Sequence, residues 1–191
     1  MSKIFTKNNR GFTFIETMIA LFIFTMAVLA MMSIMSKGIS DTGYAKRKLI
    51  AAYLAQEGVE YIRNLRDTYI LYNASSSQAG WNAFVTRVTT TADCDGGNGC
   101  YFNDQALNFS DLTQPIVDIA VATCGSSCPT LLYNSATGRY NYTAGESSGF
   151  SRKISVILTN ANEVKILSTV SWTEKSRTYQ IISSEVLFNW I

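Results

Sequence analysis

The pattern of apolar and polar positions begins with an unbroken apolar run near the N-terminus. The 20 residues from Thr17 to Ser36 carry no charge, and 16 of them are apolar. As a helix rising about 1.5 Å per residue, such a run spans about 30 Å, the thickness of the hydrocarbon core of a bilayer. A core helix of a soluble protein is rarely apolar on all sides, so the pattern predicts a membrane-spanning helix.

Beyond this run, apolar residues recur at every third or fourth position up to about residue 67. They form one face, which comprises Ile50, Leu54, Gly58, Tyr61 or Ile62, and Leu65. Charged residues fill the other positions, as in an amphipathic helix. No proline precedes Pro115. We therefore expect one helix from about residue 12 to about residue 67, with Gly38 or Gly43 as the places where it would kink.

From residue 150 onward the period changes to two. Three runs, at residues 151–160, 163–172 and 178–190, alternate apolar and polar positions and are joined by short polar turns. Ser168 is the one polar interruption on the apolar side of the second run. This pattern predicts an antiparallel meander with one apolar face, which the amphipathic part of the helix would cover. Helix first and sheet second, without βαβ alternation, gives an α+β fold.

Between residues 70 and 150 the sequence loses its helical period and is rich in serine, threonine, asparagine and glycine. We expect surface loops with two short strands, at residues 84–91 and 115–123. Such loops often carry binding specificity. Their aromatic side chains are candidates for contact with a sugar, a surface or DNA, although core packing is their commoner role. These residues are Trp81, Tyr101, Phe102, Tyr133, Tyr140 and Tyr142.

All four cysteines, Cys94, Cys100, Cys124 and Cys128, fall in this loop-rich part. An even number in an exported domain favours disulfides, and of the possible pairings we prefer the local bridges Cys94–Cys100 and Cys124–Cys128. The alternative is a zinc site built from four thiolates. Zinc-binding pairs usually have about two to four residues between the cysteines, and only the second pair fits. The polar segment around Asp93 lacks the spacing of a calcium loop. We expect no metal and no cofactor.

The distribution of charge predicts a membrane topology, and the composition excludes several classes of function. The formal net charge is only +2, which does not suggest a general nucleic-acid binder. Lys3, Lys7 and Arg10 stand before the apolar run with no acid among them. Such a basic flank predicts a cytoplasmic N-terminus. The chain has no histidine, which excludes Ser-His-Asp triads, Cys-His pairs and His-based zinc sites. No nucleophile motif occurs either, so we do not expect an enzyme.

The junction between the basic leader and the apolar run carries a specific motif. It reads Arg10, Gly11, Phe12, Thr13, Phe14, Ile15 and Glu16, followed by the apolar run. This string resembles the prepilin motif of the type IV pilin family, in which a membrane peptidase cuts after the glycine and methylates the new N-terminal amine. The resemblance implies leader cleavage between Gly11 and Phe12, N-methylation of Phe12, and a role for Glu16 in subunit assembly.

The chemistry of these residues agrees with that role. Cleavage after Gly11 frees an amine with a pKa of about 8, which is mostly protonated at neutral pH. A lone cation buried among apolar helices is costly unless it is paired, and Glu16 of the same or a neighbouring chain is the natural counter-charge. The partners that the resemblance implies are other pilin subunits, the prepilin peptidase, the inner-membrane pilus assembly machinery, and membrane lipid before assembly.

Two features refine the resemblance: the first favours a minor pilin or a pseudopilin over a major pilin, and the second favours a minor pilin. Many major pilins have a helix-breaking proline where this chain has Ser33. The segment at residues 54–67, LAQEGVEYIRNLRD, resembles minor pilins of the PilV, or pilus-modification, type. The first alternative is a pseudopilin of a type II secretion system, which shares the leader. From another class, the alternative is a signal-anchored exported binding domain that is not cut at Gly11. An exported enzyme is the least expected.

These inferences give one organisation for the chain. We expect a leader peptide at residues 1–11, a transmembrane and filament-core helix at 12–36, its amphipathic continuation at 37–69, and an extracytoplasmic head at 70–191. The fold would be α+β and pilin-like, with the outer half of the helix packed on the antiparallel sheet of a loop-rich head. The protein would first span the cytoplasmic (inner) membrane with its N-terminus inside, and then enter an extracellular pilus.

Overall fold

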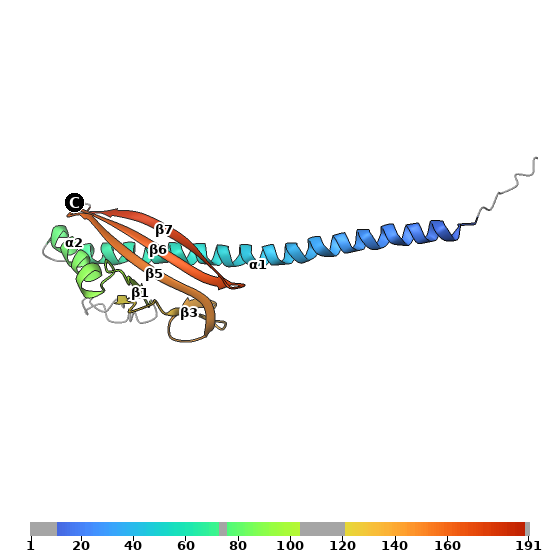
Figure 1. The fold of residues 1–191 in the computed structure, drawn as a ribbon. Coiled ribbons are helices and arrows are strands. Elements are labelled where there is room, and N and C mark those ends of the chain that lie inside the picture. Colours follow the sequence, from blue (N-terminus) through green and yellow to red (C-terminus); the bar gives the residue numbers. More distant parts are fainter. Residues whose placement is uncertain (1–10, 73–75, 104–120, 190–191) are drawn as a thin grey trace, which may run out of the picture. The chain divides into compact units, whose positions relative to one another are not determined.

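One long helix opens the fold. The computed structural model describes residues 11–72, 76–103 and 121–189, which Figure 1 draws as a ribbon. The helix, α1, spans Phe14–Tyr72, where the sequence predicted about residues 12–67. The chain divides into two compact units, residues 1–46 and residues 47–191, so that α1 contributes to both.

The first unit consists of the N-terminal part of α1 and the residues before it. Within residues 11–46, its large apolar side chains are exposed and form no buried cluster. Among the described residues, α1 is a helix long and apolar enough to cross a membrane. Neither Gly38 nor Gly43 interrupts it, and Ser33 is helical as well. A glycine in a helix interior costs only about 1 kcal/mol, whereas a proline would remove a hydrogen bond and break the helix.

The second unit is built around a seven-stranded antiparallel sheet. Its long strands follow the order β7–β6–β5, and β5 pairs on its other side with β1 and with β3. The strands are β1 (Cys100–Phe102), β2 (Val121–Thr123), β3 (Thr130–Asn134), β4 (Arg139–Asn141), β5 (Glu146–Asn160), β6 (Glu163–Glu174) and β7 (Arg177–Phe188). The two short hairpin partners, β2 and β4, lie beyond β1 and β3.

The predicted C-terminal meander is confirmed. Strands β5 and β6 pair from Phe150↔Trp172 to Asn160↔Glu163, and β6 and β7 pair without a break along their full length. A two-residue turn joins β6 to β7, and both of its residues, Lys175 and Ser176, have positive φ. Two positive φ angles in succession are the signature of the turn that best matches the twist of a hairpin.

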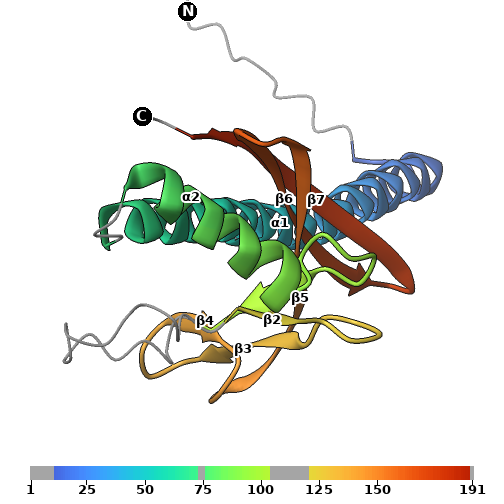
Figure 2. The same ribbon diagram turned by 90° about the vertical axis from the view of Figure 1, so that its left-hand side faces the viewer.

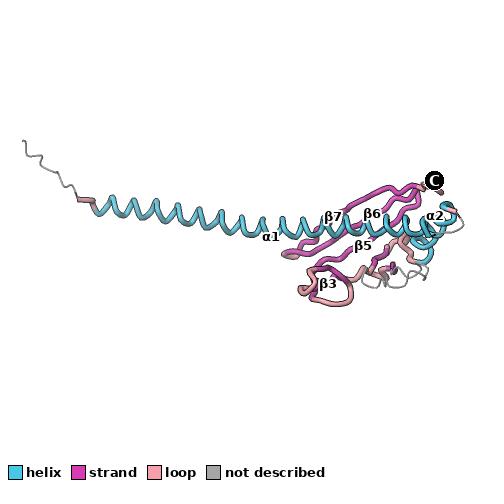
Figure 3. The backbone as a smooth tube through the Cα atoms, turned by 180° about the vertical axis from the view of Figure 1, so that it is seen from behind, coloured by secondary structure: helices cyan, strands magenta, loops and turns pink. Residues whose placement is uncertain are grey.

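The C-terminal part of α1 covers one face of this sheet, as Figure 3 shows. Ile62 and Leu65 project from the predicted apolar face of the helix into a single core cluster that includes Ile154 of β5 and Ile166 of β6. The alternation of buried and exposed positions along β5 and β6 matches the period of two in the sequence. The α+β class, a long N-terminal helix followed by an antiparallel sheet, is thus confirmed.

The strand predicted at residues 84–91 was wrong. The chain there forms helix α2 (Ser77–Thr86) followed by a π-helical turn, η1 (Arg87–Thr91). The β-branched residues suggested a strand, but the buried residues Trp81, Phe84 and Val88 recur at helical spacing. Ser76 caps α2, because its hydroxyl accepts a hydrogen bond from the backbone N–H of Ala79 at 3.1 Å.

Helix α2 lies beside the C-terminal end of α1 (Figures 1 and 2). The approach is close at Gly80, where an added Cβ would lie 2.6 Å from the carbonyl oxygen of Tyr69. Of the second predicted short strand, residues 121–123 form β2. Its remaining residues, 115–120, lie outside the described residues.

Candidate functional site

The N-terminus of α1 carries a reciprocal pair of hydrogen bonds between Thr13 and Glu16. The backbone N–H of Thr13 donates to Oε2 of Glu16, and the backbone N–H of Glu16 donates to Oγ1 of Thr13, both at 3.4 Å. This arrangement is a capping box, which satisfies two N–H groups that the first turn of a helix leaves free. It also places the Glu16 carboxylate at the positive end of the helix dipole.

Gly11 and Phe12, the residues on either side of the expected cut, lie just before the helix. Both are non-helical and exposed, and no atom lies within 4 Å of the place where a Cβ on Gly11 would stand. A peptidase needs an accessible, non-helical peptide bond, and this segment offers one. The structure thus brings Thr13 and Glu16 together and places the Gly11–Phe12 bond next to them. Arg10 and the rest of the leader lie outside the described residues.

The second unit contains two disulfides, with the local pairing that the spacing favoured. Cys94 is bonded to Cys100, and Cys124 to Cys128. All four sulfurs are therefore used, which leaves no thiolate for zinc. Within residues 11–72, 76–103 and 121–189, no three His, Cys, Asp or Glu side chains are grouped so as to hold a metal ion.

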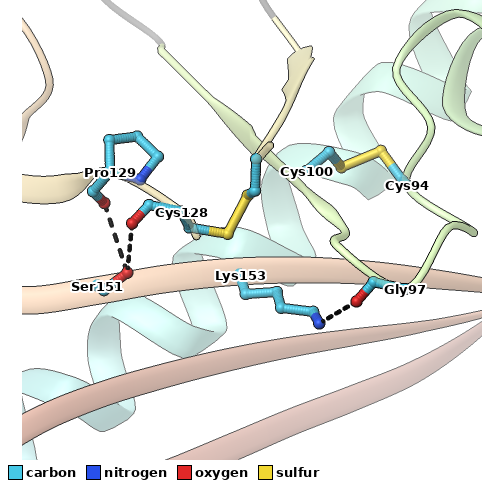
Figure 4. Close-up of a disulfide and its surroundings, with 8 residues drawn as sticks. Cys94, Gly97, Cys100, Cys128, Pro129, Ser151 and Lys153 are labelled. Carbon is cyan, nitrogen blue, oxygen red and sulfur yellow. Dashed lines mark hydrogen bonds between the residues drawn. A yellow bond between two sulfur atoms is a disulfide. The ribbon is translucent and has the colours of Figure 1, made fainter. Parts of the chain in front are cut away.

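Hydrogen bonds attach both disulfide loops to the central strand β5, as Figure 4 shows. Lys153 Nζ donates to the carbonyl oxygen of Gly97, in the first loop, at 2.8 Å. Ser151 Oγ donates to the carbonyl oxygen of Cys128, at the end of the second, at 3.1 Å. The disulfides therefore stiffen two loops that are already held to the sheet.

Two of the six aromatic candidates, Trp81 and Phe102, are part of the buried core. Trp81 is fully buried, and its Nε1–H donates to the carbonyl oxygen of Ala161 at 2.8 Å. Phe102 is also buried and stacks on Tyr61 of α1 with 3.6 Å between ring centroids. Tyr133 and Tyr140, whose centroids are 5.1 Å apart, lie nearer the surface. Tyr101 and Tyr142 form a further tilted pair at 5.0 Å.

A buried arginine joins α1 to the sheet, and sequence reasoning missed it. Arg152 of β5 has a side chain that is only 3 % exposed, and its Nη1 donates to Oε2 of Glu57 on α1 at 2.7 Å. The guanidinium also lies 3.9 Å above the ring of Phe102, in a cation–π contact. The position of Arg152 in the strand pattern could have identified it from sequence as a buried residue. Arg152 occupies an inward position between the apolar residues Phe150 and Ile154.

Tyr142 shares this environment. Burial raises the pKa of its phenol above the ordinary value of 10.0, and the positive charge of Arg152 partly opposes that rise. A buried cation with one carboxylate, one aromatic face and a nearby neutral phenol forms a structural junction between helix and sheet.

Comparison with known proteins identifies one part of the chain. Residues 6–32 match the prokaryotic N-terminal methylation motif. No curated protein and no solved structure matches the chain. The match includes the Gly11–Phe12 bond, the capping box and much of the exposed apolar helix. The match supports a type IV pilin-like or pseudopilin subunit, which has a structural role rather than an enzymatic one. A subunit of this kind is processed by a prepilin peptidase and associates with other pilins.

Proposed function

We propose that this chain is a minor pilin, a structural subunit of a type IV pilus that is assembled through its N-terminal helix. The observation that carries the proposal is the coincidence, within residues 6–32, of the methylation motif with an exposed apolar helix and a Thr13–Glu16 capping box. A helix that is apolar on all sides needs a bilayer or other helices around it. A pilin uses both environments, first the membrane and then the filament core.

Processing follows from the geometry of the leader junction. The prepilin peptidase cuts the exposed bond between Gly11 and Phe12, and the new amine of Phe12 is methylated. The leader, with its basic residues, stays on the cytoplasmic side, and the remaining chain spans the inner membrane. The amine remains protonated at neutral pH. Its positive charge then lies one residue before the capping box that holds the Glu16 carboxylate.

Glu16 gives assembly its register. Apolar packing between helices is non-directional, so it attracts subunits without fixing their axial positions. An ion pair between the carboxylate of Glu16 and the Phe12 amine of a neighbouring subunit has one favourable position. It also removes the cost of burying either charge alone. The glutamate thus contributes specificity, while the apolar helix contributes most of the attraction.

Two sequence features support a minor pilin rather than a major one. Ser33 stands where many major pilins have proline, and α1 continues through it. The segment at residues 54–67 resembles minor pilins of the PilV type. The second candidate function is a pseudopilin of a type II secretion system, because the methylation motif serves both classes equally. A signal-anchored exported binding domain would lack processing at Gly11.

The deciding experiment is co-expression of the full chain with a prepilin peptidase, followed by intact mass and N-terminal sequencing. We expect a chain that begins at Phe12 and carries one added methyl group. Gly11→Val should block the cut, whereas the matched Gly38→Val substitution, at a glycine inside α1, should leave processing unchanged. A chain that still begins at Met1, or that is cut beyond Ser36, would refute the pilin proposal.

A second measurement separates the two filament classes. Sheared pili from a producing strain should contain the processed chain, and Glu16→Gln should remove it from them without preventing the cut. If the chain is instead absent from sheared pili and its deletion stops secretion of folded proteins, the pseudopilin assignment holds.

A further inference from the structure

A groove in the second unit lies between α1 and the hairpin of β3 and β4. It has a volume of about 580 Å³, within the range of about 300–1,000 Å³ that is typical of small-molecule sites. We call it the tyrosine–arginine groove. Its lining comes from one stretch of α1, from the turn between β3 and β4, and from the start of β4. It comprises Ile50, Tyr53, Leu54, Glu57, Gly138, Arg139 and Tyr140.

Two tyrosine rings give the groove its apolar surfaces. Tyr53 projects from α1 and is 64 % exposed, although it belongs to the part of the helix that covers the sheet. Tyr140, from strand β4, packs against Tyr133 at 5.1 Å and against Phe150 at 6.2 Å between ring centroids. Because that ring is fixed by its neighbours, a ligand that stacks on it loses little side-chain entropy.

The polar lining offers complementary groups. Arg139 is exposed and makes no ion pair within residues 11–72, 76–103 and 121–189, and its guanidinium can only donate hydrogen bonds. The carboxylate of Glu57 can only accept them, and its charge is balanced by Arg152 at 2.7 Å. The Tyr140 hydroxyl is neutral at physiological pH, since the ordinary phenol pKa is 10.0 and burial raises it further. The excess charge of the groove is therefore the positive charge of Arg139.

This combination selects for one class of ligand. A hydroxyl group both donates and accepts hydrogen bonds, so a polyhydroxylated ligand satisfies Arg139 and Glu57 together. A phosphodiester group can only accept hydrogen bonds, so it offers no donor to the carboxylate of Glu57. The C–H faces of a pyranose ring are apolar and suit the tyrosine rings. A carboxylate is the group that pairs with a planar guanidinium in bidentate geometry.

We propose that the tyrosine–arginine groove binds an acidic saccharide. The sugar ring lies against Tyr53 and Tyr140, its carboxylate pairs with Arg139, and a hydroxyl donates to Glu57. The proposal concerns the second unit alone and does not depend on cleavage at Gly11. Its failure would leave the pilin proposal untouched.

The test is a titration of the full chain in detergent micelles with trigalacturonate, and with neutral galactotriose as the comparison ligand. We expect saturable binding of the acidic sugar, at least fivefold tighter than that of the neutral one. Arg139→Gln should abolish this preference while leaving the neutral sugar's affinity unchanged. Tyr53→Ala should weaken both ligands tenfold or more, and Tyr53→Phe, which keeps the ring, should restore most of the binding. Arg177→Gln is the matched control, because it removes an exposed arginine outside the groove.

Three results would overturn the proposal. The first is the absence of saturable binding of either sugar. The second is an Arg139→Gln variant that keeps the acidic preference, which would place the anion elsewhere. The third is binding of a decathymidylate or a tyrosine-rich peptide that is tighter than that of trigalacturonate and is lost in the same variants. Such a result would make the groove a site for nucleic acid or protein.

Discussion

Gly58 of α1 lies directly against Ser168 of β6. A Cβ at position 58 would stand 3.0 Å from the Cβ of Ser168, closer still to its hydroxyl oxygen, and 3.3 Å from Cδ of Arg152. Helix and sheet therefore approach closely at a point where the helix has no side chain and the strand carries a small one. The Ser168 hydroxyl is buried without a hydrogen-bond partner among the described residues.

The first prediction concerns this contact. In an exposed helix Gly→Ala stabilises by about 1 kcal/mol, but Gly58→Ala should destabilise the head by about 1–3 kcal/mol because the added methyl overlaps Ser168. Ser168→Ala alone should be neutral or stabilising, since it removes an unsatisfied buried hydroxyl. In the double variant part of the loss should be recovered, with a coupling of about 1 kcal/mol in urea unfolding. Gly43→Ala, with open space around it, should not destabilise.

The second prediction concerns the Arg152–Glu57 pair. Glu57→Gln leaves a nearly buried cation without its carboxylate and should cost about 1–3 kcal/mol. Arg152→Met should cost less, because Glu57, whose side chain is 43 % exposed, can be hydrated when it is alone. Glu60→Gln, which breaks the exposed pair with Arg63, should cost less than about 1 kcal/mol. Finding Arg152→Met worse than Glu57→Gln would show that the arginine acts chiefly by packing.

The third prediction ranks the disulfides. Each closes a short loop, which is worth about 2 kcal/mol through the entropy of the unfolded chain. Cys94 and Cys100 are in addition fully buried in the core cluster, whereas Cys128 is half-buried. The double substitution of Cys94 and Cys100 by alanine should therefore lower the free energy of unfolding by about 3–5 kcal/mol. The same double substitution of Cys124 and Cys128 should lower it by about 2 kcal/mol. Equal losses in urea unfolding would mean that burial of the first pair adds nothing.

The fourth prediction is a pH dependence. The raised pKa of Tyr142 means that the folded state holds this phenolic proton more tightly than the unfolded state does. Its contribution to stability is therefore fully present below the unfolded pKa of about 10, and is lost as the pH rises through the folded value. Tyr142→Phe should move the alkaline unfolding midpoint to higher pH. Tyr53→Phe, at an exposed site, is the matched control for the loss of a phenol.

The sequence predicted the long elements because each repeats one period over many residues. The alternation of apolar and polar positions along the second strand run has one exception, Ser168. This serine is the residue that contacts Gly58. The helix was likewise continuous because nothing in it competes with the helical period. The prediction of a strand at residues 84–91 was wrong for the opposite reason, because the segment is too short to repeat its period many times. Over eight residues its β-branched side chains outweighed the helical spacing of Trp81, Phe84 and Val88.

The residues of the N-terminal motif lie close together in the chain, so the sequence alone could predict that they are neighbours in the structure. Thr13 and Glu16 stand three apart, and a capping box requires that local spacing. The ion pair between Arg152 and Glu57 joins residues 95 positions apart in the chain. The tyrosine–arginine groove likewise needs a helix and a distant turn to meet. No local sequence pattern predicts such long-range contacts, so they could be identified only from the tertiary structure.

The local pairing of the cysteines bears on the order of events during export. In the proposed topology the residues after the apolar helix are translocated in chain order, so both disulfide loops emerge before β6 and β7. Each bridge joins cysteines six or four positions apart, so it can close without waiting for the strands that form most of the sheet. Oxidation and sheet formation are thus separable steps. The strands translocated last meet a partner whose loops are already covalently closed.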